Sequence, residues 1–407
     1  MTGALEAVER TAGAPVAPTV AGIRAAIAPV LAELAATARR REGTRDHPFE
    51  QVRALAAARL MVIGIPVADG GAGGTVREVA ETVVDLARAD SHVAQALRTS
   101  FMTAHQASVR ADLPYRARTL ERLLRGELFA GTSNERSGGA SGSVNTTVRR
   151  EGAGYLLDGI KYYSTGGLYA DWFGGNAVDE DGQTVSFSVP TDRPGVELLD
   201  DFDAVGQRLT ASGTTRLTGV SLAADEIVRI DRSALPNPWL GTFAQLYLAS
   251  IEAGIAAAAL DDAISFGRTK ARPIKHSTAQ LSTDDPYVRH VVGRIAARAH
   301  AARSAVLLAA ETLERVRHAP AEQVRPVGAE AAVVVAQAQY LAIESALAAG
   351  ELLFDVGGGS ATDRAHALDR HWRNARTIAN HNPRDWKAAV VGGYYLAGEE
   401  PPTTGLF

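Results

Sequence analysis

The sequence contains no cysteine. Disulfides, thiolate nucleophiles, iron–sulfur clusters and cysteine-bound zinc are therefore excluded. The ten histidines are scattered, without a pair at the three- or four-residue spacing of a helical metal site, and we expect no metal. No Gly-x-Gly-x-x-Gly follows a strand pattern, so the sequence predicts no nicotinamide site.

An excess of charge of one sign is also missing. The chain of 407 residues has 42 Lys and Arg against 46 Asp and Glu, a net charge of −4, and no sustained basic block. Nucleic acid and anionic membranes are therefore not expected as partners. We find no uninterrupted apolar run of about 18 residues and no signal-peptide pattern. The sequence predicts a cytoplasmic protein without a transmembrane helix.

Apolar residues make up 46% of the chain and charged residues 22%, which is typical of globular domains. Residues 1–18, rich in Ala, Pro and Gly, predict a flexible N-terminal arm. Residues 19–125 carry apolar side chains at helical spacing, which predicts a helical domain. Residues 126–232 contain short β-branched and aromatic runs between turn residues, which predicts a β domain. Residues 233–407 predict a bundle of long helices and a C-terminal tail.

This order of blocks resembles the acyl-CoA dehydrogenase fold, an α+β architecture. The resemblance implies an N-terminal helical domain, a central β-barrel or sandwich, and a C-terminal four-helix bundle. Three short segments strengthen it: Leu60–Pro66 with Gly70-Gly71, Leu86–Asp90, and Asp158-Gly159-x-Lys161 followed by Ser164-Thr165-Gly166-Gly167. Together they extend the resemblance over nearly the whole chain.

Two chemistries occur on this fold, and two positions discriminate between them. Dehydrogenases need a carboxylate that removes the α-proton of an acyl thioester. The positions that match the two known locations of this base hold Asn382 and Ala244. Neither side chain can abstract a proton, so dehydrogenation is disfavoured.

Three other segments resemble the flavin-dependent monooxygenases of this fold, which include dibenzothiophene monooxygenase and amine N-hydroxylases. They are residues 206–214, residues 268–273, and residues 369–377 with His381-Asn382-Pro383. The resemblance implies a two-component enzyme that takes reduced FMN, or FAD, from a separate NAD(P)H-dependent flavin reductase. Through a C4a-hydroperoxyflavin it would use O2 to oxygenate a small organic substrate at S, N or activated C. It also implies a homotetramer.

Two alternatives stay open. One is an FAD-dependent acyl-CoA dehydrogenase type of enzyme with an unrecognised base, which acts on an acyl thioester. The other is a catalytically silent member of the fold that binds or assembles with other molecules. Bleaching of bound flavin by an acyl-CoA would favour the first, and failure to bind flavin would favour the second.

The resemblance assigns candidate catalytic residues. His381 is the candidate for proton transfer, because histidine titrates near neutral pH. Ser164 and Thr165 are both candidates for a contact at flavin N5, and the sequence does not choose between them. The family has two further histidines at the site; one position holds Ile378 here, and the other falls near Ser100. Without these two histidines the site is less basic, and Ser100 is the candidate residue at the second position.

Other residues are candidates for flavin binding. Arg268 or Arg272 is expected at the flavin phosphate, because the guanidinium group suits bidentate phosphate contacts. Asn134 is also a candidate, because it lies where the β domain of this fold begins to contact flavin; alternatively it only forms a turn. Arg376 is a further candidate for flavin binding; alternatively it forms an ion pair between helices. Glu252 and Glu344, on apolar helices, are interpreted as structural.

Overall fold

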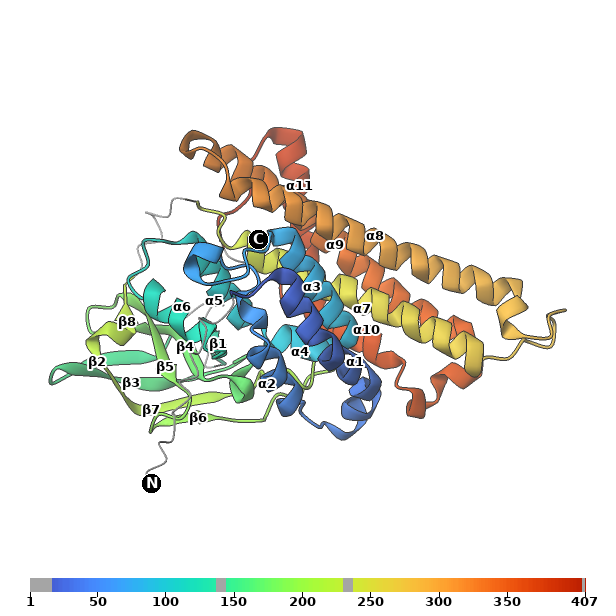
Figure 1. Cartoon of the computed structure of the whole chain (residues 1–407), viewed down its shortest axis with the longest axis horizontal. Coiled ribbons are helices and arrows are strands. Elements are labelled where there is room, and N and C mark those ends of the chain that lie inside the picture. The colour runs from blue at the N-terminus through green and yellow to red at the C-terminus, as the bar shows by residue number, and fades with distance from the viewer. Residues whose placement is uncertain (1–16, 137–143, 230–236, 405–406) are drawn as a thin grey trace, which may run out of the picture.

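The structure is a computed structural model, which describes residues 17–136, 144–229, 237–404 and 407. Most of the N-terminal arm predicted at residues 1–18 lies outside the described residues. A helical part, a curled sheet and a set of long helices follow one another along the chain, as predicted (Figure 1).

The N-terminal part is helical because its segments begin at well-formed caps. The side chain of Thr75 accepts a hydrogen bond from the N–H of Glu78, and the Glu78 carboxylate accepts one from the N–H of Thr75 at 2.8 Å. This capping box starts α3. The preceding turn needs glycine at position 71, because a Cβ there would lie 2.2 Å from the carbonyl oxygen of Ile65. The helices are α1 (Val20–Thr44), α2 (Phe49–Ala57), α3 (Val76–Ala89), α4 (Ser91–Ala96), α5 (Arg98–Val109) and α6 (Arg116–Leu124).

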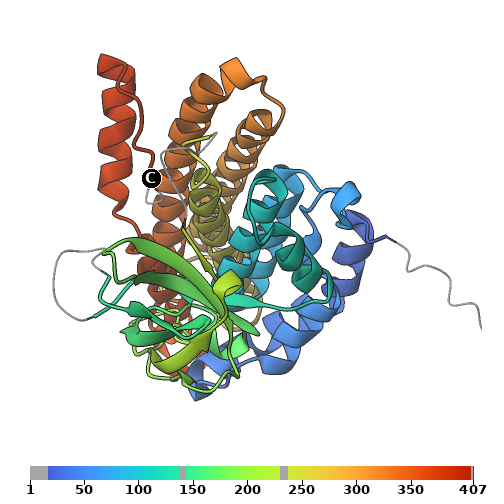
Figure 2. The ribbon, with the colours of Figure 1, turned by 90° about the vertical axis from the view of Figure 1, so that its left-hand side faces the viewer.

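The central part is a curled sheet with the strand order β6-β7-β3-β2-β4-β5-β8, and β1 pairs in parallel with β4. Along β5, Val185, Phe187 and Val189 are buried at alternate positions, as expected for a strand with one face toward the core. Figure 2 shows the curled sheet beside the N-terminal helices. The strands are β1 (Phe129–Thr132), β2 (Thr147–Glu151), β3 (Gly154–Lys161), β4 (Trp172–Val178), β5 (Thr184–Pro190), β6 (Val196–Leu198), β7 (Thr215–Leu222) and β8 (Ile227–Val228).

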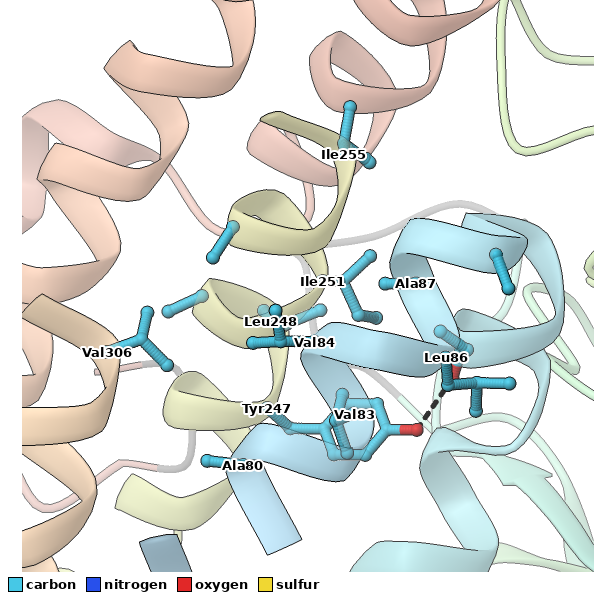
Figure 3. Packing of buried hydrophobic residues seen from close by; sticks show 14 of the residues in the cluster. Ala80, Val83, Val84, Leu86, Ala87, Tyr247, Leu248, Ile251, Ile255 and Val306 are labelled. Carbon is cyan, nitrogen blue, oxygen red and sulfur yellow. Dashed lines mark hydrogen bonds between the residues drawn. The ribbon is translucent and has the colours of Figure 1, made fainter. Parts of the chain in front are cut away.

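The C-terminal part consists of α7 (Thr242–Thr269), α8 (Pro286–Arg317), α9 (Val324–Gly357), α10 (Asp369–Ala379) and α11 (Arg384–Ala397). Helix α7 packs against α8, α9 and α3, and it thereby joins the bundle to the N-terminal part. Figure 3 shows Val83 and Leu86 of α3 facing Tyr247 and Ile251 of α7. The Tyr247 hydroxyl donates a 2.7 Å hydrogen bond to the carbonyl of Ala94, so its polar end is satisfied inside this core.

Three stretches are long and apolar enough, by length and composition alone, to cross a membrane: Val20–Thr44, Thr242–Thr269 and Ala321–Thr362. None of the three is an uninterrupted apolar run, and they qualify by their mean hydropathy. The most apolar windows of the second and third stretches are 78% and 61% buried within the protein, so core packing accounts for their hydropathy. The window in α1 is only 17% buried, and most of its exposed positions are alanines, which carry little apolar surface.

Candidate active site

A cavity of about 820 Å³ opens where the three parts of the chain meet. The end of α4 and the start of α5 form one wall, and the end of α10 with the residues after it forms another. The residues that follow β1 and β3, and the loop of residues 202–212 before β7, complete the lining. This volume is in the range of small-molecule and cofactor sites.

The two neighbouring hydroxyl groups that follow β3, those of Ser164 and Thr165, differ in their position relative to the cavity. Thr165 lines the cavity, and its hydroxyl lies 2.9 Å from the Ser212 hydroxyl. Ser164 is only 1% exposed, is not part of the lining, and accepts a 2.7 Å hydrogen bond from the Thr215 hydroxyl. The structure therefore places Thr165 where it can meet a ligand and Ser164 inside the β domain.

The two loops that carry these hydroxyls hold non-glycine residues in left-handed backbone conformations. Tyr163 has a φ of 62°, Gln207 a φ of 56° and Ala211 a φ of 50°. Such conformations are unfavourable for residues with a Cβ, and they cluster at binding and catalytic sites. Gly166, with a φ of 84°, lets this loop approach α4, because a Cβ there would lie 2.3 Å from the carbonyl oxygen of Ala96.

A buried ion pair fixes the segment after β1. The Lys161 Nζ lies 2.6 Å from a Glu135 carboxylate oxygen, and the side chains are 0% and 2% exposed. The same carboxylate accepts hydrogen bonds from the hydroxyl and the N–H of Thr146. Although burial opposes ionisation, these partners lower the pKa of Glu135 to about 2. The pair holds the neighbouring Asn134 on the cavity wall, and the Asn134 carbonyl accepts a hydrogen bond from the N–H of Tyr162.

His381 lines the cavity just after α10. Its ring Nδ1 lies 3.2 Å from the Asn382 side-chain oxygen. Desolvation by the surrounding protein, together with the positive charge of Arg98, lowers the pKa of His381 to about 4. The imidazole is therefore neutral near pH 7, so it can accept a proton or a hydrogen bond from a ligand.

Ser100 does not line the cavity. It is 1% exposed, donates a hydrogen bond to the Phe129 carbonyl and accepts one of 2.8 Å from the Phe129 N–H. Its hydroxyl joins α5 to β1. A catalytic role for Ser100 stays a prediction that this placement does not support.

The predicted arginines lie outside the cavity lining of the single chain. Arg268 and Arg272 are exposed at the end of α7 and just after it, at the end of the bundle away from the sheet (Figure 1). Arg376 lies near Glu252, whose carboxylate oxygens have no hydrogen-bond partner among the described residues. Burial raises the pKa of Glu252 well above its ordinary value, and the charge of Arg376 opposes this only in part. Glu344 pairs with Arg384, as expected for a structural carboxylate.

The loop of residues 202–212 is anchored on both sides of the cavity. The Gln207 N–H donates a 2.7 Å hydrogen bond to the Asn374 side chain on α10, and the Gln207 amide donates to the Ser91 hydroxyl on α4. Arg373 donates to the Val205 carbonyl and forms a 2.6 Å ion pair with Glu42 of α1. The sequence analysis had singled out residues 206–214, and this anchoring explains why the segment has a fixed conformation.

Among the polar residues of the cavity lining that the sequence analysis did not predict are Gln95 and Arg98. The Gln95 side-chain oxygen is buried without a hydrogen-bond partner among the described residues. Arg98 is the single charged residue between His92 and His105, and this isolation is the sequence signal that could have identified it.

Within residues 17–136, 144–229 and 237–404, no group of three or more histidine and carboxylate side chains could hold a metal ion. The side chains on the cavity wall carry hydroxyl, amide, imidazole, guanidinium and carboxylate groups.

Known proteins resemble this chain in sequence and in fold. Residues 246–386 match the family model of the acyl-CoA dehydrogenase C-terminal domain. Dibenzothiophene monooxygenase of Mycolicibacterium goodii is 28% identical, over 86% of this chain and 88% of its own length. The probable FMNH2-dependent monooxygenase SfnC of Pseudomonas putida is 28% identical, over 91% and 93%.

A solved structure has the same fold along almost the whole chain. TdsC from Paenibacillus sp. A11-2, in its complex with FMN and indole, superimposes with a TM-score of 0.85. It is 24% identical, and the match covers 95% of this chain and 100% of TdsC. The predicted fold is thereby confirmed, and the two relatives named above are monooxygenases. The chain therefore has the acyl-CoA dehydrogenase fold, and over most of its length it is similar to monooxygenases, one of which is named as FMNH2-dependent.

Proposed function

We propose that this protein binds reduced FMN in the 820 Å³ cavity and uses it with O2 to oxygenate a small organic substrate at S, N or activated C. The observation that carries this proposal is the placement of Thr165 and His381 on one cavity, in a chain that matches an FMNH2-dependent relative over 91% of its length. In the overall reaction the substrate gains one oxygen atom, the other leaves as water, and the reduced flavin is oxidised.

The residues of the cavity fit a flavin. The unpartnered Gln95 oxygen can accept a hydrogen bond from a ring N–H, and the Thr165 hydroxyl can form one at the edge of the ring. Asn134 adds a further amide to the lining. FMN is favoured because SfnC is described as FMNH2-dependent and TdsC was solved with FMN, and FAD is the alternative cofactor.

Bound reduced flavin supplies the two electrons that activate O2. The protein must position the ring, exclude water and move protons. The Thr165 side chain is placed to orient the ring, and the neutral His381 imidazole is placed to accept or relay a proton. Tyr163 and Phe202, whose rings lie 6.3 Å apart, cover part of the cavity with apolar surface.

At the two positions that match the base of the dehydrogenases, this chain has Ala244 and Asn382 instead of a carboxylate. The Asn382 amide donates a 2.7 Å hydrogen bond to the Gln245 side chain, and Asn382 is 3% exposed. Glu252 is buried in the bundle and does not line the cavity. We therefore rank acyl thioester oxidation below oxygenation.

The proposal includes two partners, a separate NAD(P)H-dependent flavin reductase and further copies of this chain in a homotetramer. Large apolar side chains on α8 and α11 support assembly, since Leu308 is 60% exposed, Trp386 69% and Leu396 91%. Arg268 and Arg272 lie too far along the bundle to line the cavity of their own chain. A flavin phosphate that binds them would therefore lie in the cavity of another copy.

The experiment that tests the function needs no substrate. Purified protein is titrated anaerobically with reduced FMN and, separately, with reduced FAD, and is then mixed with oxygenated buffer. We expect reduced FMN to bind and its reoxidation to differ in rate from that of free FMN, although without a substrate the oxygen consumed leaves as H2O2 in both cases. A matched titration with butyryl-CoA on FAD-loaded protein tests the alternative. Reoxidation identical to that of free flavin, with flavin bleaching by the acyl-CoA, would refute the monooxygenase function.

A further inference from the structure

Arg98 is a cation on the cavity wall without an anionic partner. It is the first residue of α5, and the fold directs it to the same cavity as His381. Among the described residues no carboxylate lies within ion-pair distance of it, and its Nε is buried without a hydrogen-bond partner. Arg41, another buried arginine, instead pairs with the Asp90 carboxylate.

The other groups at the cavity do not neutralise this charge. His381 is neutral near pH 7, because its pKa is lowered to about 4. Of the carboxylates on the lining, Glu135 is bound to Lys161, and Asp203 is exposed. The Arg136 guanidinium also lines the cavity and stacks 3.3 Å from the centre of the Tyr162 ring. The α5 side of the cavity therefore has positive charge.

An uncompensated charge in a partly desolvated site is unfavourable, and desolvation accordingly lowers the pKa of Arg98 to about 10. A methionine or leucine would fill the same volume without this cost. A guanidinium is also the side chain that best matches the geometry of a carboxylate or a similar oxyanion. A ligand that carries such a group would form an ion pair and hydrogen bonds with the Arg98 guanidinium and would thereby offset its desolvation.

On the basis of the proposed function, we propose that Arg98 determines substrate specificity by binding an anionic group of the substrate. The substrates are then small organic anions, carboxylates or other oxyanions, and not uncharged aromatic molecules. The guanidinium holds the anionic group by charge-assisted hydrogen bonds, and the atom to be oxygenated lies toward the flavin. Arg98 takes no part in the transfer of oxygen or of protons.

The test compares acids with amides of the same shape. The pairs are acetate and acetamide, benzoate and benzamide, and indole-3-acetate and indole-3-acetamide. Dissociation constants are measured by isothermal titration calorimetry on the protein with oxidised FMN bound and without it. The variants are Arg98→Met and Arg98→Lys, with Arg136→Met as the control that removes the other cavity guanidinium.

We expect at least one acid to bind wild type at least tenfold more tightly than its amide. Arg98→Met should abolish this preference, Arg98→Lys should retain part of it, and Arg136→Met should leave it in place. A second readout is the melting temperature of the ligand-free protein, which Arg98→Met should raise because it removes an unpaired charge. The same acid should raise the melting temperature of wild type but not that of Arg98→Met.

Three outcomes would overturn the inference: no acid is preferred by wild type, the preference survives in Arg98→Met, or Arg98→Met weakens FMN binding tenfold and leaves acid binding unchanged. The last result would assign Arg98 to the flavin. Failure of wild type to bind FMN refutes the proposed function instead, and the acid–amide comparison without FMN distinguishes the two failures.

Discussion

Lys161 and Glu135 form a buried ion pair of 2.6 Å directly behind the cavity wall. Lys161 is the last residue of β3, and Glu135 lies in the segment after β1, so the pair joins two parts of the sheet that are not hydrogen-bonded neighbours. Thr146 also donates hydrogen bonds to this carboxylate, so these contacts fix Glu135 and with it the segment that carries the cavity residue Asn134.

Removal of one member of this pair should be costly. Lys161→Met leaves a buried carboxylate without its cation, and we expect a loss of about 3–5 kcal/mol in the free energy of unfolding. The double variant Glu135→Gln/Lys161→Met should recover part of this loss, since neither charge then stays buried. Urea unfolding of the three proteins measures both effects. A single variant as stable as wild type would show that the pair is not needed.

A second buried cluster, formed by His92, Glu42 and Asp90, should make the stability of the protein depend on pH. His92 lies 3.1 Å from the Glu42 carboxylate and 3.0 Å from that of Asp90, and these charges raise its pKa to about 9 despite burial. Because the folded-state pKa is above the unfolded value, this stabilisation is complete below about pH 6.5 and is lost as the pH rises through 9. The loss is on the order of 3 kcal/mol.

The measurement is the free energy of unfolding of wild type and His92→Gln between pH 6 and pH 10. Wild type should lose stability over this range, and the variant should show a flatter curve. Glu42, whose pKa is lowered to about 2, contributes in the opposite direction: its stabilisation is present above about pH 4.5 and is lost as the pH falls through 2. Parallel alkaline curves for the two proteins would contradict the assignment to His92.

The position of the flavin contact can be tested at two adjacent residues. Thr165→Val removes the hydroxyl on the cavity wall, and we expect FMN binding to weaken by about five- to tenfold, the effect of one hydrogen bond. Ser164→Ala alters a hydroxyl that is buried against Thr215, so it should lower stability and leave FMN affinity unchanged. Fluorescence titration with FMN checks both variants. The reverse pattern would transfer the N5 contact to Ser164.

The order of the three parts could be predicted from the sequence, because the apolar period changes from helical to strand-like and back along the chain. Helix α11 was not predicted: it contains the pair Gly392-Gly393, which lowers helix propensity, and within this helix only Lys387 is buried. The C-terminal motif indicated His381, which lines the cavity, and its role in proton transfer stays a prediction.

The remaining site residues depend on geometry that a single sequence does not contain. Arg268 and Arg272 follow a family motif, but the length of α7 carries them to the far end of the bundle. Ser164 and Thr165 have the same local sequence context, and the turn that orients them in opposite directions depends on residues 210–215. Arg98 was missed because the sequence does not reveal which face of α5 meets the cavity.

The role of His381 can be separated from flavin binding. His381→Ala should leave FMN affinity nearly unchanged, because the imidazole is not needed to hold the ring, but it should increase the rate at which the FMN-loaded protein releases H2O2 after it reacts with O2. The histidine is already neutral near pH 7, with its pKa lowered to about 4, so this rate should not change between pH 6 and pH 8 in wild type. Oxygen-electrode and peroxide assays with reduced FMN measure it.

His381→Gln, which keeps a hydrogen-bonding group but cannot carry a proton at these pH values, is the matched variant. If His381→Gln releases little peroxide, His381 acts through a hydrogen bond. If both variants release much peroxide, His381 transfers a proton. If both release as much as wild type, His381 has no role in the mechanism.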